Sequence, residues 1–242
     1  MILAYESMQF NQDEHKLINM NLHEIVKTSD GSDTVFQKEL GEHYHSTFGA
    51  VQESLHVFIN SGLRYCNKTS LTIFEVGFGT GLNAYLTISE SFTNEKSIRY
   101  ITVEKYPLSQ EIWKSLNYPE IMKDTNQLYF KNIHEAPWNQ EISITTNFSF
   151  LKLSSDLTLL DFSALPPFDL IYYDAFSPEK QPELWETQLF KNLADHCLQD
   201  AIIVTYCAKG AVRRSLKDAG FIPERLPGPP GKREMLRATK SI

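Results

Sequence analysis

The sequence contains little cysteine and no long apolar run. Its three cysteines, Cys66, Cys197 and Cys207, are scattered without a Cys-x-x-Cys pair. This argues against a disulfide framework or a zinc site and favours a reducing compartment. No stretch of roughly 18 apolar residues is present, so we expect no transmembrane helix. Residues 1–16 become polar too early for a signal peptide. We therefore expect a cytoplasmic protein.

The sequence also lacks a Gly-x-Gly-x-x-Gly dinucleotide fingerprint, internal repeats and low-complexity tracts. Without that fingerprint and a hydride-handling histidine, an NAD-dependent dehydrogenase is the least favoured class. His43 and His45 flank a tyrosine, but no carboxylate or third histidine has a metal-motif spacing. We expect these two histidines to have a structural or substrate-rim role, and we expect no metal.

The charge is unevenly distributed along the chain. The net charge is −7, but residues 207–242 contain nine Lys or Arg and three acids, a net +6, which leaves −13 for the rest. A basic patch on an acidic body can bind phosphates, although a solvated helix face is the alternative. A hydrophobic content of 42% in 242 residues is ordinary for a globular protein. We predict an N-terminal extension over residues 1–65, containing a β-hairpin and a helix, and a main domain over residues 66–242.

The most informative segment is Ile73–Asn83, with the sequence IFEVGFGTGLN. An apolar run, Leu71–Phe74, ends in Glu75, and a helix-compatible segment, Leu82–Ser89, follows the glycines. The glycines occupy alternate positions: Gly77, Gly79 and Gly81. A strand, a glycine turn and a helix are the typical opening of a nucleotide-binding α/β domain. The Glu-x-Gly-x-Gly-x-Gly pattern resembles motif I of class I S-adenosylmethionine (SAM) methyltransferases. A carboxylate near the turn suits this cationic ligand and would repel a pyrophosphate.

A second acid strengthens this interpretation. Arg99–Val103 is rich in strand formers and ends in Glu104, 23 residues after Gly81. An acid about 20 residues past the glycine turn accepts hydrogen bonds from a ribose diol. A solvated charge at the end of a strand is the alternative.

The rest of the chain alternates between strand and helix patterns. We predict a hairpin from residues 22–27 and 34–39. We predict helices over residues 48–60, 107–117, 119–131, 183–198 and 212–219. We predict strands over residues 142–153 with a turn at Asn147, 168–173, 201–206, 221–226 and 234–239, the last two antiparallel. This alternation predicts a class I methyltransferase-like α/β fold, a Rossmann-like doubly wound sheet with right-handed crossovers.

Asp174 follows the apolar run Phe168–Tyr173 and opens a loop that ends at Trp185. Ligands of such sheets bind outside the carboxyl ends of the strands, so Asp174 is the candidate catalytic residue. Phe176 and Trp185 are candidates for stacking on a base. Asp156, before a short helical segment, is a candidate partner of the adenine amino group. Methyl transfer from a sulfonium needs alignment and a neutral amine, so Asp174 would orient the amine or accept its proton.

Together these blocks resemble the methyltransferase half of MnmC, the bacterial tRNA 5-methylaminomethyl-2-thiouridine biosynthesis bifunctional protein. The resemblance is carried by EVGFGTGLN (75–83), VEKYPL (103–108), YDAFSPEKQPELW (173–185), TYCAKGAVRRSLKDAGF (205–221) and GKREMLRA (231–238). It implies SAM-dependent methylation of 5-aminomethyl(-2-thio)uridine at the tRNA wobble position. The implied cofactor-binding residues are Glu75, Gly77, Phe78, Gly79, Gly81, Asn83, Glu104, Lys105 and Asp156. The implied catalytic residue is Asp174, and the implied tRNA contacts are Phe176, Trp185, Lys209, Arg213, Arg214, Lys232 and Arg233.

The family continues into an FAD-dependent oxidase half that is absent from these 242 residues. We therefore expect the stand-alone methyltransferase form. The aminomethyl group would come from a separate protein or by another route. Two other functions stay open on the residues alone: a SAM-dependent transferase acting on a small-molecule amine, and a catalytically silent SAM-fold binding protein.

Overall fold

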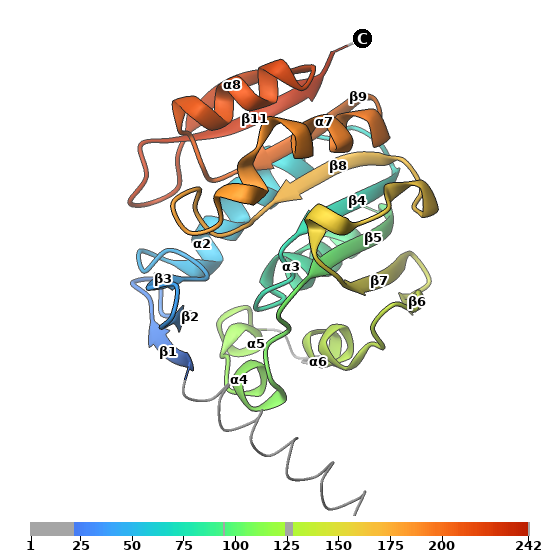
Figure 1. Cartoon of the computed structure of the whole chain (residues 1–242). Helices are drawn as coiled ribbons and strands as arrows, with labels where there is room; N and C mark the ends of the chain where they lie inside the picture. The colour runs from blue at the N-terminus through green and yellow to red at the C-terminus, as the bar shows by residue number, and fades with distance from the viewer. Residues whose placement is uncertain (1–21, 94, 124–127, 242) are drawn as a thin grey trace, which may run out of the picture.

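An eight-stranded sheet organises the chain (Figure 1), and the computed structural model describes residues 22–93, 95–123 and 128–241. The strand order is β10-β11-β9-β8-β4-β5-β7-β6. The strands are β4 (Ser70–Val76), β5 (Ser97–Glu104), β6 (Ile142–Thr145), β7 (Phe148–Ser154), β8 (Phe168–Tyr173), β9 (Cys197–Thr205), β10 (Phe221–Pro227) and β11 (Glu234–Lys240). β7, β5, β4, β8 and β9 are mutually parallel, whereas β6, β11 and β10 pair antiparallel. The predicted doubly wound sheet, the turn at Asn147 and the antiparallel final pair are confirmed.

Helices cover both faces of the sheet. They are α2 (Ala50–Ser54), the π-helical η1 (Leu55–Leu63), α3 (Leu82–Thr93), α4 (Gln110–Lys114), α5 (Tyr118–Ile121), α6 (Leu128–Glu135), the 3-10 turns η2 (Leu157–Leu159), η3 (Phe162–Ala164) and η4 (Pro182–Trp185), α7 (Thr187–His196) and α8 (Gly210–Asp218). One core lies against η1, α3 and α6, and a second lies against α7 and α8, on the other side in Figure 1. β8 is buried at every position because it is covered on both faces, which explains its continuous apolar sequence.

The order of the strands reverses between β4 and β8, and this reversal positions the site. β5 lies on one side of β4 and β8 on the other. Just past the strands, the Gly77 N–H donates to Val103 O at 3.0 Å and the Asp174 N–H donates to Val76 O at 3.1 Å. The glycine turn and the loop after β8 therefore leave the sheet side by side. A crevice at such a switch point is where ligands of these sheets bind.

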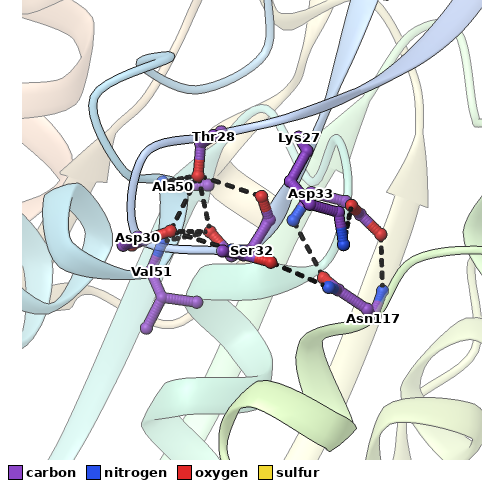
Figure 2. A network of polar contacts seen from close by, with 9 residues as sticks. Lys27, Thr28, Asp30, Ser32, Asp33, Ala50, Val51 and Asn117 are labelled. Atoms are coloured by element: carbon purple, nitrogen blue, oxygen red, sulfur yellow. Dashed lines mark hydrogen bonds and ion pairs between the residues drawn. The ribbon is translucent and has the colours of Figure 1, made fainter.

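The N-terminal residues that the structure describes form a three-stranded antiparallel sheet of β1 (His23–Lys27), β2 (Asp33–Gln37) and β3 (Glu42–His43). The predicted hairpin is confirmed, and β3 is an addition. Figure 2 shows how the hairpin turn is attached. Ser32 Oγ accepts from Val51 N at 3.3 Å. Asp30 Oδ2 accepts from Gln52 N at 2.9 Å. Hairpin side chains therefore satisfy free N–H groups of the first turn of α2.

Asn117, before α5, holds the same hairpin from the other side. Its side-chain oxygen accepts from Asp33 N at 2.9 Å, and its Nδ2 donates to Gly31 O at 2.9 Å. Val35 and Ala50 also belong to the core that includes η1 and α3. The N-terminal segment is therefore fixed against the main sheet, and the division at residue 65 stays a prediction.

Several predicted helix bounds were wrong. The two helices expected over 107–131 are the shorter α4, α5 and α6, because the chain is extended up to Ser109 and Pro119 starts a new first turn. The helix expected over 183–198 splits at Glu186, whose ψ of 144° is extended, and Cys197 already pairs with β8. Residues 1–21 and 124–127, which include the polar N-terminus and part of the helix expected over residues 119–131, lie outside the described residues. None of the described helices has the length and apolar character needed to cross a bilayer.

Candidate active site

A cavity of about 850 Å³ lies at the switch point between β4 and β8. Residues from the N-terminal sheet, the glycine turn, the ends of β5 and β8, and the turn between β10 and β11 line it. The predicted site residues that line it are Gly77, Phe78, Gly79, Asn83, Glu104, Lys105, Asp156, Asp174, Phe176 and Lys232. The predicted residues outside its lining are Glu75, Gly81, Trp185, Lys209, Arg213, Arg214 and Arg233.

The glycine turn brings backbone against the cavity. Its three glycines have φ values of 87°, 50° and 74°. At Gly77 a Cβ would lie 2.9 Å from the carbonyl oxygen of Asp174, so a side chain there would push apart the two loops of the site. The Phe78 ring packs in the core, with its centroid 5.1 Å from that of the His134 ring. The turn is thus a cradle that a ligand can approach closely.

Glu104 connects this cradle to the end of β5. Its Oε2 accepts from Gly79 N at 3.1 Å and its Oε1 from Tyr106 N at 2.8 Å. Burial raises its pKa, while these backbone N–H groups act in the opposite direction. The side chain lines the cavity, at the position expected for a ribose partner.

Lys105 and Asp156 form an ion pair of 2.8 Å at the cavity rim. The hydrogen bond from Lys105, with those from Thr158, lowers the pKa of Asp156 to about 2. Asp156 also caps η2, accepting from Thr158 N at 2.9 Å, which confirms the short helical turn expected after it. A role of either residue toward adenine stays a prediction.

Glu75 lies beneath the cavity, inside β4, with no exposed surface. Burial raises its pKa to about 8. Tyr100, Thr102 and Asn83 present polar groups to it, yet neither carboxylate oxygen makes a hydrogen bond of normal geometry with another described residue. This pKa favours the protonated form of Glu75 near neutral pH, and the residue lies outside the cavity lining.

Asp174 lines the cavity directly after β8. Asn83 Nδ2 donates to its Oδ2 at 2.8 Å. Burial is the largest influence on its pKa, which rises to about 7, and the charge of Glu53 adds to this rise. The hydrogen bond from Asn83 and the charge of Lys232 lower it. A carboxyl group with this pKa can exchange a proton near neutral pH.

Trp185 does not face the cavity, which corrects its assignment as a stacking residue. The residue is 6% exposed, its ring centroid lies 5.0 Å from that of Tyr173, and its Nε1 donates to Phe176 O at 2.8 Å. It therefore shapes the loop after β8. Phe176 does line the cavity, with its ring edge-on to Tyr44 at 4.9 Å.

The basic C-terminal segment is largely engaged within the protein. Lys209 pairs with Glu179, Arg225 with Glu234, Lys232 with Glu53 and Arg237 with Glu224, and Lys240 donates to Cys197 O. Arg213, Arg214, Lys217 and Arg233 are exposed and make no ion pair with another described residue. Fewer basic residues of this segment are therefore available to bind phosphates than the sequence predicted. Lys232 belongs to the cavity wall.

Residues of the cavity wall that the sequence did not predict include Tyr44, Glu53, Lys180 and Tyr206. Tyr206 ends the predicted strand over 201–206, so the strand-end rule that selected Asp174 would also have found it. No sequence pattern marks Glu53 as a cavity residue, because it is a buried acid on a helix and not at the end of a strand. His43 and His45 line the cavity as well, and His45 Nε2 bonds Thr80 Oγ1 at 2.7 Å. Within the described residues, no group of three or more His, Cys, Asp or Glu could hold a metal ion.

The chain is similar to known proteins in sequence and in fold. The chain is 34% identical over 223 residues to the tRNA 5-methylaminomethyl-2-thiouridine biosynthesis bifunctional protein MnmC of Pseudomonas savastanoi pv. phaseolicola, covering 84% of this chain and 32% of the relative. It is 32% identical over 246 residues to the MnmC of Pseudomonas syringae pv. syringae, covering 93% and 34%. The chain therefore spans about a third of the length of these curated relatives.

A solved structure of MNMC2 from Aquifex aeolicus superposes with a TM-score of 0.73 at 26% identity, over 90% of this chain and 70% of that one. The model of a family described as S-adenosyl-L-methionine-dependent methyltransferase matches residues 117–241, more than half of the chain. The matched region contains Asp174 and strands β6 to β11 of the main sheet. The predicted fold class and cofactor are confirmed, and the chain belongs to this family of S-adenosyl-L-methionine-dependent methyltransferases.

Proposed function

We propose that the protein methylates the primary amine of 5-aminomethyl(-2-thio)uridine at the wobble position of tRNA, giving 5-methylaminomethyl(-2-thio)uridine. The observation that carries the proposal is Asp174, which lines the cavity beside the glycine turn with a pKa of about 7. The names of the relatives, which refer to this tRNA modification, support the choice of acceptor. Because the proposed substrate is tRNA, we expect the protein to act in the cytoplasm.

The glycine turn and Glu104 are the proposed cofactor end of the cavity. Gly77 and Gly79 admit the ligand to the backbone, and Glu104, held by two backbone N–H groups, would accept hydrogen bonds from the ribose. Lys105 and Asp156 would close the adenine side. S-adenosylmethionine supplies the electrophilic methyl group when bound.

Asp174 is the proposed proton acceptor at the other end of the cavity, where the amine would bind. An aminomethyl group is an ammonium near neutral pH and must lose a proton before its nitrogen can attack. Asp174 would accept that proton, while the 2.8 Å hydrogen bond from Asn83 fixes the carboxylate. The rings of Phe176 and Tyr44, in edge-on contact at 4.9 Å, would cover the amine and limit access of water.

Exposed arginines are the proposed tRNA contacts. Arg213 and Arg214 lie in α8, which follows the carboxyl end of β9, and Arg233 lies in the turn before β11, next to the cavity residue Lys232. All three are therefore near the cavity side of the sheet. Their interaction with phosphates would weaken with salt.

Incubation with methyl-labelled S-adenosylmethionine and bulk tRNA from a methylation-deficient strain, followed by nucleoside analysis, tests the proposal. We expect the label in 5-methylaminomethyl(-2-thio)uridine. Asp174→Ala should keep cofactor binding and lose at least about 100-fold in transfer. The exposed Asp161, outside the cavity lining, supplies the control Asp161→Ala. Label only in added free amines would favour the small-molecule alternative, and full turnover by Asp174→Ala would remove Asp174 from the mechanism.

A further inference from the structure

The turn between β10 and β11 is fastened to the N-terminal segment at the edge of the cavity. His56 Nε2 donates to Pro227 O at 2.8 Å. Gly231 has a φ of 83°, and a Cβ there would lie 2.2 Å from the Phe48 ring, so only glycine fits against this ring. Lys232 Nζ completes the attachment through its ion pair with Glu53.

The Lys232 ammonium is held by two contacts, the Glu53 carboxylate and the face of the Tyr206 ring. Glu53, 5% exposed, pairs with it through Oε1 while its Oε2 accepts from Ser46 N at 2.7 Å. The Tyr206 ring lies beneath the ammonium, with its centroid 3.9 Å from Nζ. The Tyr206 hydroxyl in turn donates to Ala175 O at 2.9 Å, next to Asp174. A cation fixed this way is part of the cavity wall.

Glu53, Lys232 and Asp174 line the same cavity, and the two charges of the pair act on the pKa of Asp174 in opposite directions. Glu53 raises the pKa of Asp174 and Lys232 lowers it. The other groups that face or influence Asp174 are Asn83 from α3, Glu75 from β4, Tyr100 from β5 and Tyr206 after β9, with Glu42 from β3 acting on Tyr206. Lys232 is the cation of this set.

We propose that Lys232 is a positioning residue for the methyl-transfer reaction: paired with Glu53 over the Tyr206 ring, it neutralises Glu53 and keeps Asp174 ionised to receive the proton of the acceptor amine. This inference rests on the proposed role of Asp174. Without the Lys232 charge, the Glu53 carboxylate would lack its ion-pair partner in the wall of the same cavity and would favour the protonated form of Asp174. Without the Glu53 charge, Lys232 would favour the ionised form.

Matched neutral substitutions separate this electrostatic role from a structural one. Lys232→Met should move the ionisation midpoint of Asp174 upward by about one pH unit, and Glu53→Gln should move it downward by a similar amount. The double variant should return close to the wild-type midpoint, and Lys232→Arg should retain it. If the substitutions only detached the turn between β10 and β11, both single variants would shift the Asp174 midpoint in the same direction. Shifts of opposite sign therefore identify an electrostatic role.

Two measurements on the full chain are needed. Carbon-13 NMR of labelled aspartate side chains gives the Asp174 midpoint without any substrate, with Asp174→Asn used to assign the signal. The acid limb of the kcat–pH profile with tRNA gives the same midpoint during turnover. Thermal melts and cofactor affinity establish that each variant is folded.

Opposite NMR shifts with matching shifts of the acid limb would support the proposal. Opposite NMR shifts without any methyl transfer to tRNA would leave the electrostatic role of Lys232 intact and overturn the proposed acceptor instead. Shifts of equal sign, or no shift in either single variant, would overturn the role of Lys232.

Discussion

The side-chain amide of Asn83 donates a 2.8 Å hydrogen bond to Asp174 Oδ2 and so joins the first turn of α3 to the end of β8. Residue 83 follows the glycine turn directly, so one short segment provides both the predicted cofactor cradle and the support of the predicted proton acceptor. The bond also lowers the pKa of Asp174 against the larger effect of burial.

Replacing Asn83 by Ala should therefore make Asp174 harder to ionise. We expect the acid limb of the kcat–pH profile to move to higher pH and the rate at pH 7 to fall about tenfold, since hydrogen bonds to a charged group contribute roughly 1.5–3 kcal/mol. The rate should recover at higher pH. Equal loss at all pH values would indicate that Asn83 acts on binding or folding instead.

Reversing the charge of Arg213 and Arg214 to Glu should raise the KM for tRNA and flatten its dependence on salt, because fewer phosphate contacts release fewer counterions. Steady-state kinetics at several salt concentrations measure both effects. Lys131→Glu is the control, since Lys131 lies on α6, away from α8 in Figure 1, and makes only a weak, exposed pair of 3.8 Å with Glu135. Unchanged tRNA affinity in the arginine variants would remove α8 from the proposed tRNA surface.

Gly77→Ala should weaken cofactor binding and lower stability by about 1–3 kcal/mol. Its φ of 87° disfavours a side chain, and the added Cβ would lie 2.9 Å from a backbone oxygen that cannot move independently of Asp174. Calorimetric titration with the cofactor and thermal melts measure the two effects. Gly210→Ala is the matched control, because its Cβ would meet only the end of the Arg214 side chain at 3.4 Å. Equal behaviour of the two variants would contradict the assigned role of the turn.

Glu75→Gln should change how stability depends on pH. The pKa of Glu75 is raised to about 8 in the folded protein from 4.5, so folding favours its protonated form. This contribution is fully present below about pH 4.5 and is lost as pH rises toward 8. Between pH 5 and pH 8 the wild type should lose up to about 3 kcal/mol that the neutral variant keeps. Thermal melts across this range measure the difference, with the exposed Glu24→Gln as control. Parallel curves for wild type and Glu75→Gln would show that Glu75 is ionised in the folded protein.

Local sequence patterns predicted most of the α/β sheet and its flanking helices. Alternation of apolar strands with helix-compatible segments predicted the sheet, and the acids that directly follow strands predicted Glu104 and Asp174 as cavity residues. The sheet is confirmed and both acids line the cavity, because side-chain periodicity and strand ends are properties of short segments. The chemical roles of the two acids stay predictions. The helix bounds near Pro119 and Glu186 were less accurate, because extended residues interrupt stretches whose composition favours helix.

The sequence by itself determined the α/β frame, the glycine turn and the acids at its rim, since each is encoded within a few neighbouring residues. Only the tertiary structure decided that Glu75 is buried beneath the cavity, that Trp185 is turned away from it, and that Lys232 reaches Glu53 across 179 positions of the chain. Burial and long-range charge pairs depend on how distant elements pack together, and no local pattern specifies that packing.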